Sequence, residues 1–320
     1  MLTFCRLRLY PLTGLIMQTG EISSFEVHSQ IIEKESVMIR KKQIIPVLTI
    51  AGSDSCGGAG IQADIKTISS LGLFACSCIS AVTAQNTLGV RDVFALKKSL
   101  IRNQIDAILE DLPVKAIKIG MLFDKDIIKE VSESLIRHKF QGSVVLDPVM
   151  IATSGASLLQ DDARQAMIDY LFPLVDIITP NLFEAASLAQ IKSINSLAEQ
   201  KEVALFIKNS LKTKRVLIKG GHFEQGECTD LFLDVDNSFQ TYTSKKIDSQ
   251  NTHGTGCSLS SAIASYLALG YDYKTSIGLA KEYVYLAILE SKDIFSGKGN
   301  GSLNHFFNPQ KQKFYESNCE

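Results

Sequence analysis

The sequence lacks the features that mark several large classes of protein. It has no Cys-x-x-Cys pair, and its seven cysteines are irregularly spaced, which argues against a disulfide framework or a zinc ribbon. No apolar stretch reaches the ~20 residues that span a bilayer. No basic run is longer than Arg40–Lys42, and 33 basic against 34 acidic residues leave a formal net charge of −1. We therefore expect a protein of the reducing cytoplasm that binds neither membranes nor nucleic acid.

The first 42 residues do not share the regular pattern that follows them. Arg6 and Arg8 would suit an organellar targeting peptide, but Glu21 and later acidic residues spoil that pattern. Alternatively, translation starts at Met17 or Met38. We expect residues 1–42 to be a poorly ordered extension or a mis-assigned start, 43–310 to form one domain and 311–320 to be a tail.

From Ile44 onwards, strand-like and helix-like segments alternate. The strands are short and almost continuously apolar, as in a parallel sheet covered on both faces. We predict a three-layer α/β/α sandwich with a mainly parallel central sheet and ligands at the carboxyl ends of its strands. The predicted strands are Ile44–Ala51, Phe74–Thr83, Ala116–Ile119, Ser143–Leu146, Val175–Ile178, Arg215–Lys219 and a hairpin of Leu231–Leu233 with Phe239–Thr243. The predicted helices are Ile61–Leu71, Ser99–Leu112, Ile127–His138, Asp162–Leu171, Leu197–Leu211 and two that begin near Cys257 and Tyr273.

A glycine-containing turn precedes the first of these two last helices. The run Asn251–Cys257 reads Asn-Thr-His-Gly-Thr-Gly-Cys, and Gly254 and Gly256 leave the backbone free to bring its N–H groups close to an anion. The helix N-terminus adds partial positive charge at the same place. This is no Walker loop, and an ordinary capped turn is the alternative. At a helix start the thiol pKa of Cys257 should be lowered, allowing it to accept a proton, unless Cys257 only fills a tight corner.

Other polar groups follow the predicted strands directly. Gly52–Gly60 suggests a backbone that approaches a ligand, or a flexible turn with Asp54 as its cap. The amide of Gln85 could hydrogen-bond a heterocycle or only face solvent. Lys219 could contact a nucleotide phosphate, and His253 reads as a scaffold residue more readily than as a base.

Two carboxylates could serve a metal ion. Asp147 precedes a proline, where it could bind a cation or only begin a loop. Asn181 and Glu184 could cap a helix, could surround hydrated Mg²⁺, or could do both.

Together these segments resemble the hydroxymethylpyrimidine/phosphomethylpyrimidine kinases of thiamine biosynthesis, in the ribokinase-like superfamily. The resemblance runs in order from about Ile44 to Phe307. It rests on Thr49–Asp54, Gly57–Thr67, Thr83–Thr87, Lys118–Met121, Asp147–Met150, Thr179–Asn181, Lys219–His222, Asn251–Cys257 and Gly297–Phe306. The chain departs from the usual Asp-Pro-Ser/Thr at Asp54-Ser55-Cys56, and its amino-terminal extension lies outside the match.

The resemblance implies ATP- and Mg²⁺-dependent phosphorylation of 4-amino-5-hydroxymethyl-2-methylpyrimidine and then of its monophosphate, by a homodimer. The implied pyrimidine-binding residues are Gln85, Asp64, Gly52 and Met121. The implied catalytic group is Cys257 with the cradle Gly254, Thr255 and Gly256. The implied nucleotide-binding residues are Lys219, Gly221, Asn181 and Thr252, and the implied metal-binding residues are Asp147 and Glu184.

Two other functions stay open on the sequence alone. One is a pyridoxal or pyridoxine kinase of vitamin B6 salvage, although Gln85 and Cys257 favour the pyrimidine. The other is a nucleotide-binding regulator without catalysis, which would be expected to have lost the acceptor-binding and metal-binding groups.

Overall fold

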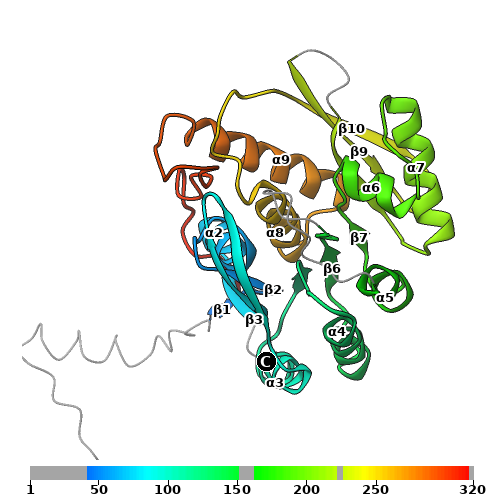
Figure 1. Ribbon diagram of the computed structural model, residues 1–320. Coiled ribbons are helices and arrows are strands. Elements are labelled where there is room, and N and C mark those ends of the chain that lie inside the picture. The colour runs from blue at the N-terminus through cyan, green and yellow to red at the C-terminus, as the bar shows by residue number, and fades with distance from the viewer. Residues whose placement is uncertain (1–41, 151–161, 222–225, 317–320) are drawn as a thin grey trace, which may run out of the picture. The chain divides into compact units, whose positions relative to one another are not determined.

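The structure is a computed structural model that describes residues 42–150, 162–221 and 226–316 (Figure 1). The expectation for residues 1–42 lies almost wholly outside the described residues. One compact unit extends from Lys42 to Tyr315. It continues past the expected boundary at residue 310, because the last strand, β11 (Phe314–Glu316), pairs with the first, β1 (Lys42–Ile44).

A nine-stranded sheet forms the centre of this unit, in the order β10-β9-β8-β7-β6-β5-β2-β3-β4. The six strands from β8 to β3 are parallel, and β4, β9 and β10 are antiparallel to their neighbours. The bounds are β2 (Pro46–Asp54), β3 (Phe74–Asn86), β4 (Gly89–Ala95), β5 (Ala116–Ile119), β6 (Ser143–Leu146), β7 (Ile177–Ile178), β8 (Val216–Gly221), β9 (Glu227–Leu233) and β10 (Phe239–Lys245). The mainly parallel sheet is confirmed, and the sequence had not indicated β4.

Helices cover both faces of the sheet (Figure 1). Alternate side chains of each strand point to opposite faces. Thus Leu48 and Ile50 pack in one apolar cluster, whereas Val47 packs in the other. The first face carries α3 (Lys98–Leu109), α4 (Lys125–Arg137), α5 (Ala163–Ala166) with its π-helical continuation Met167–Leu171, α6 (Leu182–Leu188) and α7 (Leu197–Ser210). The second carries α2 (Gly60–Ser70), α8 (Thr255–Ala268) and α9 (Tyr273–Leu289).

No helix in the described part of the chain is long and apolar enough to cross a membrane.

Candidate active site

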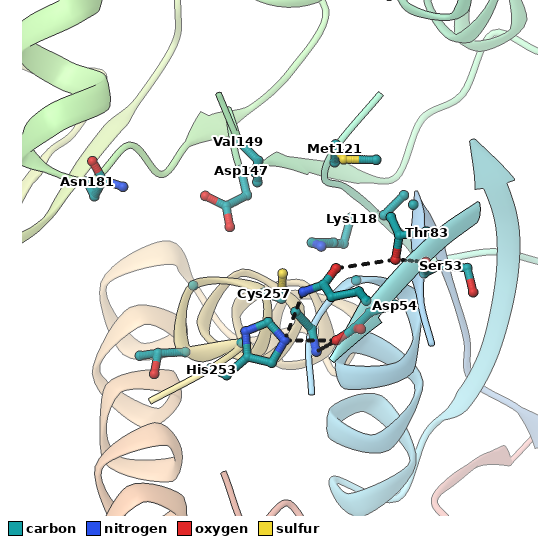
Figure 2. Close-up of a pocket in the computed structure, with 18 of the residues that line it drawn as sticks. Ser53, Asp54, Thr83, Lys118, Met121, Asp147, Val149, Asn181, His253 and Cys257 are labelled. Carbon is teal, nitrogen blue, oxygen red and sulfur yellow. Dashed lines mark hydrogen bonds and ion pairs between the residues drawn. The ribbon is translucent and has the colours of Figure 1, made fainter. Parts of the chain in front are cut away.

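A cavity of about 230 Å³ opens where the parallel strands end (Figure 2). Its wall comes from the carboxyl ends of β2, β3, β5, β6 and β8, the start of α6 and the amino-terminal end of α8. The predicted residues that line it are Gly52, Gln85, Met121, Asp147, Asn181, Glu184, Lys219, Thr252, Gly254, Thr255, Gly256 and Cys257. The structure therefore brings together groups that are up to 205 positions apart in the sequence, between Gly52 and Cys257.

The start of α8 forms an anion cradle. Gly254 is the N-cap residue and has φ 85°, a left-handed conformation that favours glycine. Thr255 donates its N–H to the Thr252 carbonyl, whereas the N–H groups of Gly256 and Cys257 have no acceptor among the described residues. Unpaired N–H groups at a helix N-terminus bind anions.

A cation and two carboxylates lie against this cradle. Lys219 Nζ is 2.7 Å from Asp147 Oδ1, and a Cβ added at Gly256 would lie 3.0 Å from the same ammonium. Burial raises the pKa of Glu184 above its ordinary value; Lys219 opposes this shift and Asp147 adds to it. A divalent cation at these two carboxylates would relieve their repulsion, and Mg²⁺ typically uses one or two carboxylates together with substrate phosphates.

Asn181 and Glu184 also form the predicted capping box of α6. The Asn181 side chain accepts from the Glu184 N–H, and the Glu184 carboxylate accepts from the Asn181 N–H, both at 2.8 Å. The Glu184 carboxylate also has a backbone hydrogen bond with Met150. A carboxylate has about four acceptor sites, so these two bonds and a cation site are compatible.

Asp54 organises the opposite wall of the cavity. Its carboxylate accepts the N–H groups of Cys56, Gly58 and Ala59, and His253 Nε2 lies 2.9 Å from its Oδ2. Burial raises the pKa of Asp54, but these hydrogen bonds outweigh it and hold the pKa below its ordinary value. Asp54 thus caps the turn, as in the alternative that the sequence left open, and His253 is bound into the scaffold.

The same hydrogen bonds fix the orientation of the Gln85 amide. His253 Nε2 must carry a proton to bond the ionised Asp54, so it cannot also accept from an amide nitrogen 3.3 Å away. The amide is therefore better turned, with its oxygen towards His253 and its nitrogen towards Thr83 Oγ1, which donates its own proton to the Ser53 carbonyl. In this orientation every polar group of the network has a partner.

Comparison with known proteins identifies the family of this chain. Residues 54–304 match the family model described as phosphomethylpyrimidine kinase. The chain is 44% identical over 259 residues to the hydroxymethylpyrimidine/phosphomethylpyrimidine kinase of Rhizobium meliloti, covering 81% of this chain and 96% of the relative. The chain belongs to the phosphomethylpyrimidine kinase family.

Solved structures agree with this assignment and with the ribokinase-like fold. The crystal structure of phosphomethylpyrimidine kinase from Clostridium difficile 630 has 46% identity and a TM-score of 0.67, and the alignment covers 76% of this chain and 99% of that one. A pyridoxal kinase from Staphylococcus aureus, in complex with AMP-PCP and pyridoxal, has 32% identity and a TM-score of 0.73 over 85% of this chain and 98% of its own. The protein is thus a phosphotransferase, and ATP is its co-substrate.

Two residues predicted for the site of this kinase do not line the cavity. Gly221 is the last residue of β8 and pairs with Thr229. Asp64 is fully buried below the cavity, where its carboxylate accepts from Thr49 Oγ1, Ser261 Oγ and Lys118 Nζ. In this structure Asp64 holds Lys118 and has no free surface for a pyrimidine.

Lys118 is the site residue that the sequence reasoning missed. Two of its ammonium N–H groups bond Asp64, at 2.8 and 2.9 Å, and the third has no acceptor among the described residues. Figure 2 shows Lys118 on the same side of the cavity as Cys257, and its charge acts on both Cys257 and Asp147. The sequence offered two hints: a lysine within the otherwise apolar strand Ala116–Ile119, and the place of Lys118–Met121 among the segments that carry the family resemblance.

The expected low pKa of the Cys257 thiol is wrong for this cavity. The pKa of Cys257 is raised to about 11, mainly by burial and also by Asp64 and Asp147, although Lys118 and a backbone hydrogen bond at Gly60 lower it. The predicted position at the start of a helix was correct, but desolvation outweighs the favourable charges there. Cys257 is therefore a neutral thiol at pH 7.

Proposed function

We propose that this kinase transfers the γ-phosphoryl group of ATP to 4-amino-5-hydroxymethyl-2-methylpyrimidine and then phosphorylates the resulting monophosphate to the diphosphate. The observation that carries the proposal is the meeting, in one cavity, of an anion cradle, a lysine, two carboxylates and an amide suited to a heterocycle. Phosphoryl transfer depends mainly on positioning and on stabilising charge, which these groups can supply.

The acceptor would bind between Gln85 and the cradle. Met121 and Gly52 would contact the ring, and Gln85 would use the hydrogen-bonding capacity that its neighbours leave free. The hydroxymethyl oxygen would face Cys257. Because this thiol is neutral, it cannot take a second proton, and we assign it to orienting the acceptor hydroxyl. The hydroxyl proton would pass to an oxygen of the transferred phosphoryl group as that group arrives.

The nucleotide would occupy a second cavity, of about 860 Å³, which adjoins the first and shares Asn181, Lys219, Thr252, Thr255 and Gly256 with it. Leu259, Val284 and Ile288 give this cavity an apolar wall for a base. Lys219 would hold the phosphates. Asp147 and Glu184 would hold Mg²⁺, which would supply positive charge against the phosphates.

A coupled ATPase assay with Mg²⁺ and three acceptors tests this function: hydroxymethylpyrimidine, its monophosphate and pyridoxal. We expect turnover with both pyrimidines. Turnover with pyridoxal alone would move the assignment to vitamin B6 salvage, and ATP hydrolysis that no acceptor stimulates would contradict a pyrimidine kinase.

We also propose a homodimer that uses the β3–β4 hairpin. Val82, Leu88 and Phe94 are large apolar side chains that stay exposed on it, Phe94 to 70%. Exposed apolar groups on an edge hairpin favour contact with a second chain. Light scattering after size-exclusion chromatography should give twice the chain mass, and a monomer at micromolar concentration would contradict this.

A further inference from the structure

The segment from Ser291 to Ser302 touches both sides of the acceptor cavity. On the cradle side, His253 donates its N–H to the Gly301 carbonyl at 3.0 Å and pairs with Ser302 in a parallel bridge. On the acceptor side, Gly299 donates its N–H to Thr87 Oγ1 at 3.1 Å, two residues beyond Gln85. One segment therefore joins two walls that come from distant parts of the sequence.

Asn251 is the side chain that fastens this segment to the cradle. It is only 5% exposed, and its amide nitrogen donates to the carbonyls of Ser291 and of Ile294, the latter at 2.7 Å. Its amide oxygen lies against Gly301, where an added Cβ would overlap it. Both N–H groups are thus used, and the side chain fills its space completely.

The link from Asn251 to the cradle is short. Three residues after Asn251, Gly254 takes its left-handed conformation with its Cα packed on the Gly58 carbonyl. The unpaired N–H groups of Gly256 and Cys257 follow at once. A shift of Asn251 would therefore turn these donors away from the phosphoryl group, and misplacement by ~1 Å can cost about 100-fold in rate.

We propose that Asn251 is a positioning residue for phosphoryl transfer: its amide locks the segment 291–302 onto the cradle loop, so that the cradle and the Gln85 end of β3 form one rigid body. This rests on the proposed function, in which the cradle holds the phosphoryl group in flight. The amide touches neither substrate; it acts through Gly254, Gly256 and Cys257.

The test is Asn251→Asp, which keeps the size of the side chain but turns two N–H donors into an oxygen that faces carbonyl oxygens. We expect kcat to fall about 30-fold or more while KM for ATP and for hydroxymethylpyrimidine changes less than about threefold, since only the transition-state contacts are misaligned. An unchanged kcat overturns the proposal, and so does a rise in both KM values with kcat retained.

A second variant keeps the proposal testable if Asn251→Asp does not fold. Thr87→Val removes the acceptor for the Gly299 N–H at the other end of the same segment and keeps the shape of the side chain. We expect kcat to fall about 3- to 10-fold, again with little change in KM. An unchanged kcat for Thr87→Val would contradict the rigid-body account.

Two controls separate this proposal from the proposed function. Thr243→Val makes the same chemical change on the β9–β10 hairpin, where Thr243 Oγ1 lies 3.1 Å from Thr229 Oγ1, and should leave kcat unchanged. The wild-type chain is assayed in parallel. If the wild type does not phosphorylate the pyrimidine, the proposed function fails; if it does and both variants match it, only the role of Asn251 fails.

Discussion

At the scale of single residues, a fully buried ion pair supports the floor of the active site. Lys118 and Asp64 are both inaccessible to solvent and 2.8 Å apart. Such a pair contributes little net stability, but removing one partner leaves an unpaired charge in the interior. Lys118 also lines the cavity, and its third N–H is not used by Asp64. The ion pair can therefore serve the active site, which an apolar contact in its place could not do.

Lys118→Met should therefore lower the free energy of unfolding by about 3–5 kcal/mol, because Asp64 stays buried without its counter-charge. Adding Asp64→Asn removes that charge, keeps an acceptor for one of the Thr49 and Ser261 hydroxyls and offers an amide N–H to the other, and should restore at least half of the loss. Urea denaturation of the two variants checks this. Equal stability of the single and double variants would contradict the account.

His305 makes the stability of the folded protein depend on pH. The pKa of His305 is lowered to about 4, mainly by burial and also by the charge of Lys66, against a backbone hydrogen bond at Leu303 that raises it. Between pH 6.5 and 4 the unfolded chain therefore binds a proton that the folded chain does not. Stability is lost as the pH falls through that window, by about 3 kcal/mol in all.

His305→Gln should remove this part of the pH dependence. We expect the difference in unfolding free energy between wild type and variant, measured from pH 7 to pH 4, to shift steadily in favour of the variant as the pH falls. A difference that stays constant over that range would show that His305 titrates normally in the folded protein.

At the scale of elements, the start of α8 is fixed by sterics as well as by hydrogen bonds. Gly254 precedes the helix and Gly270 follows it, with φ 85° and 90°. The two glycines differ in their surroundings: a Cβ at Gly254 would lie 1.8 Å from the Gly58 carbonyl oxygen, whereas one at Gly270 meets nothing within 4 Å.

Gly254→Ala and Gly270→Ala therefore form a matched pair. Both should lose about 1 kcal/mol of stability from the left-handed backbone. Only Gly254→Ala should also displace the cradle and lower kcat, by about 100-fold or more. Steady-state kinetics with denaturation curves separates the two effects, and equal kcat values for both variants would count against a cradle at this turn.

Many of the strands, helices and turns could be predicted from the sequence. Apolar runs and polar strand ends predicted the parallel sheet, the hairpin of β9 with β10 and the edge where the site lies, because these patterns are local. The capping box at Asn181 was predicted for the same reason. β4 was missed since its exposed, mixed composition does not differ from a loop.

The remaining part of the site depends on contacts between distant residues. No local pattern indicates that Lys118 bonds a carboxylate 54 positions away, or that Asp64 faces inwards from α2. The pKa of Cys257 was predicted with the wrong sign because the sequence shows the helix start but not the burial.

At the scale of the whole molecule, the chain closes on itself through its last residues. Gln310 and Lys313 donate their N–H groups to the carbonyls of Ser70 and Gly72, and the Tyr315 hydroxyl donates to the Ala268 carbonyl, all at 2.7 Å. These contacts tie the carboxyl-terminal segment to the ends of α2 and α8, far from the cavity lining.

Deleting residues 309–320 should therefore cost stability without loss of activity. Three hydrogen bonds at about 1 kcal/mol each, together with the lost pairing of β11 with β1, predict a loss of at least about 3 kcal/mol, and Tyr315→Phe alone should lose about 1 kcal/mol. Thermal unfolding with kcat measured at 25 °C tests this. A melting temperature equal to that of the wild type would mean that the segment does not brace the fold.

Phosphoryl transfer from ATP to the acceptor hydroxyl is assigned to the α8 cradle, where the hydroxyl faces Cys257. The most direct measurement is steady-state kinetics of Cys257→Ala with hydroxymethylpyrimidine and MgATP, beside the wild type. We predict that kcat falls about 100-fold or more while both KM values stay within about threefold, because the thiol orients the acceptor hydroxyl for attack in the transition state. A kcat equal to that of the wild type would contradict the claim.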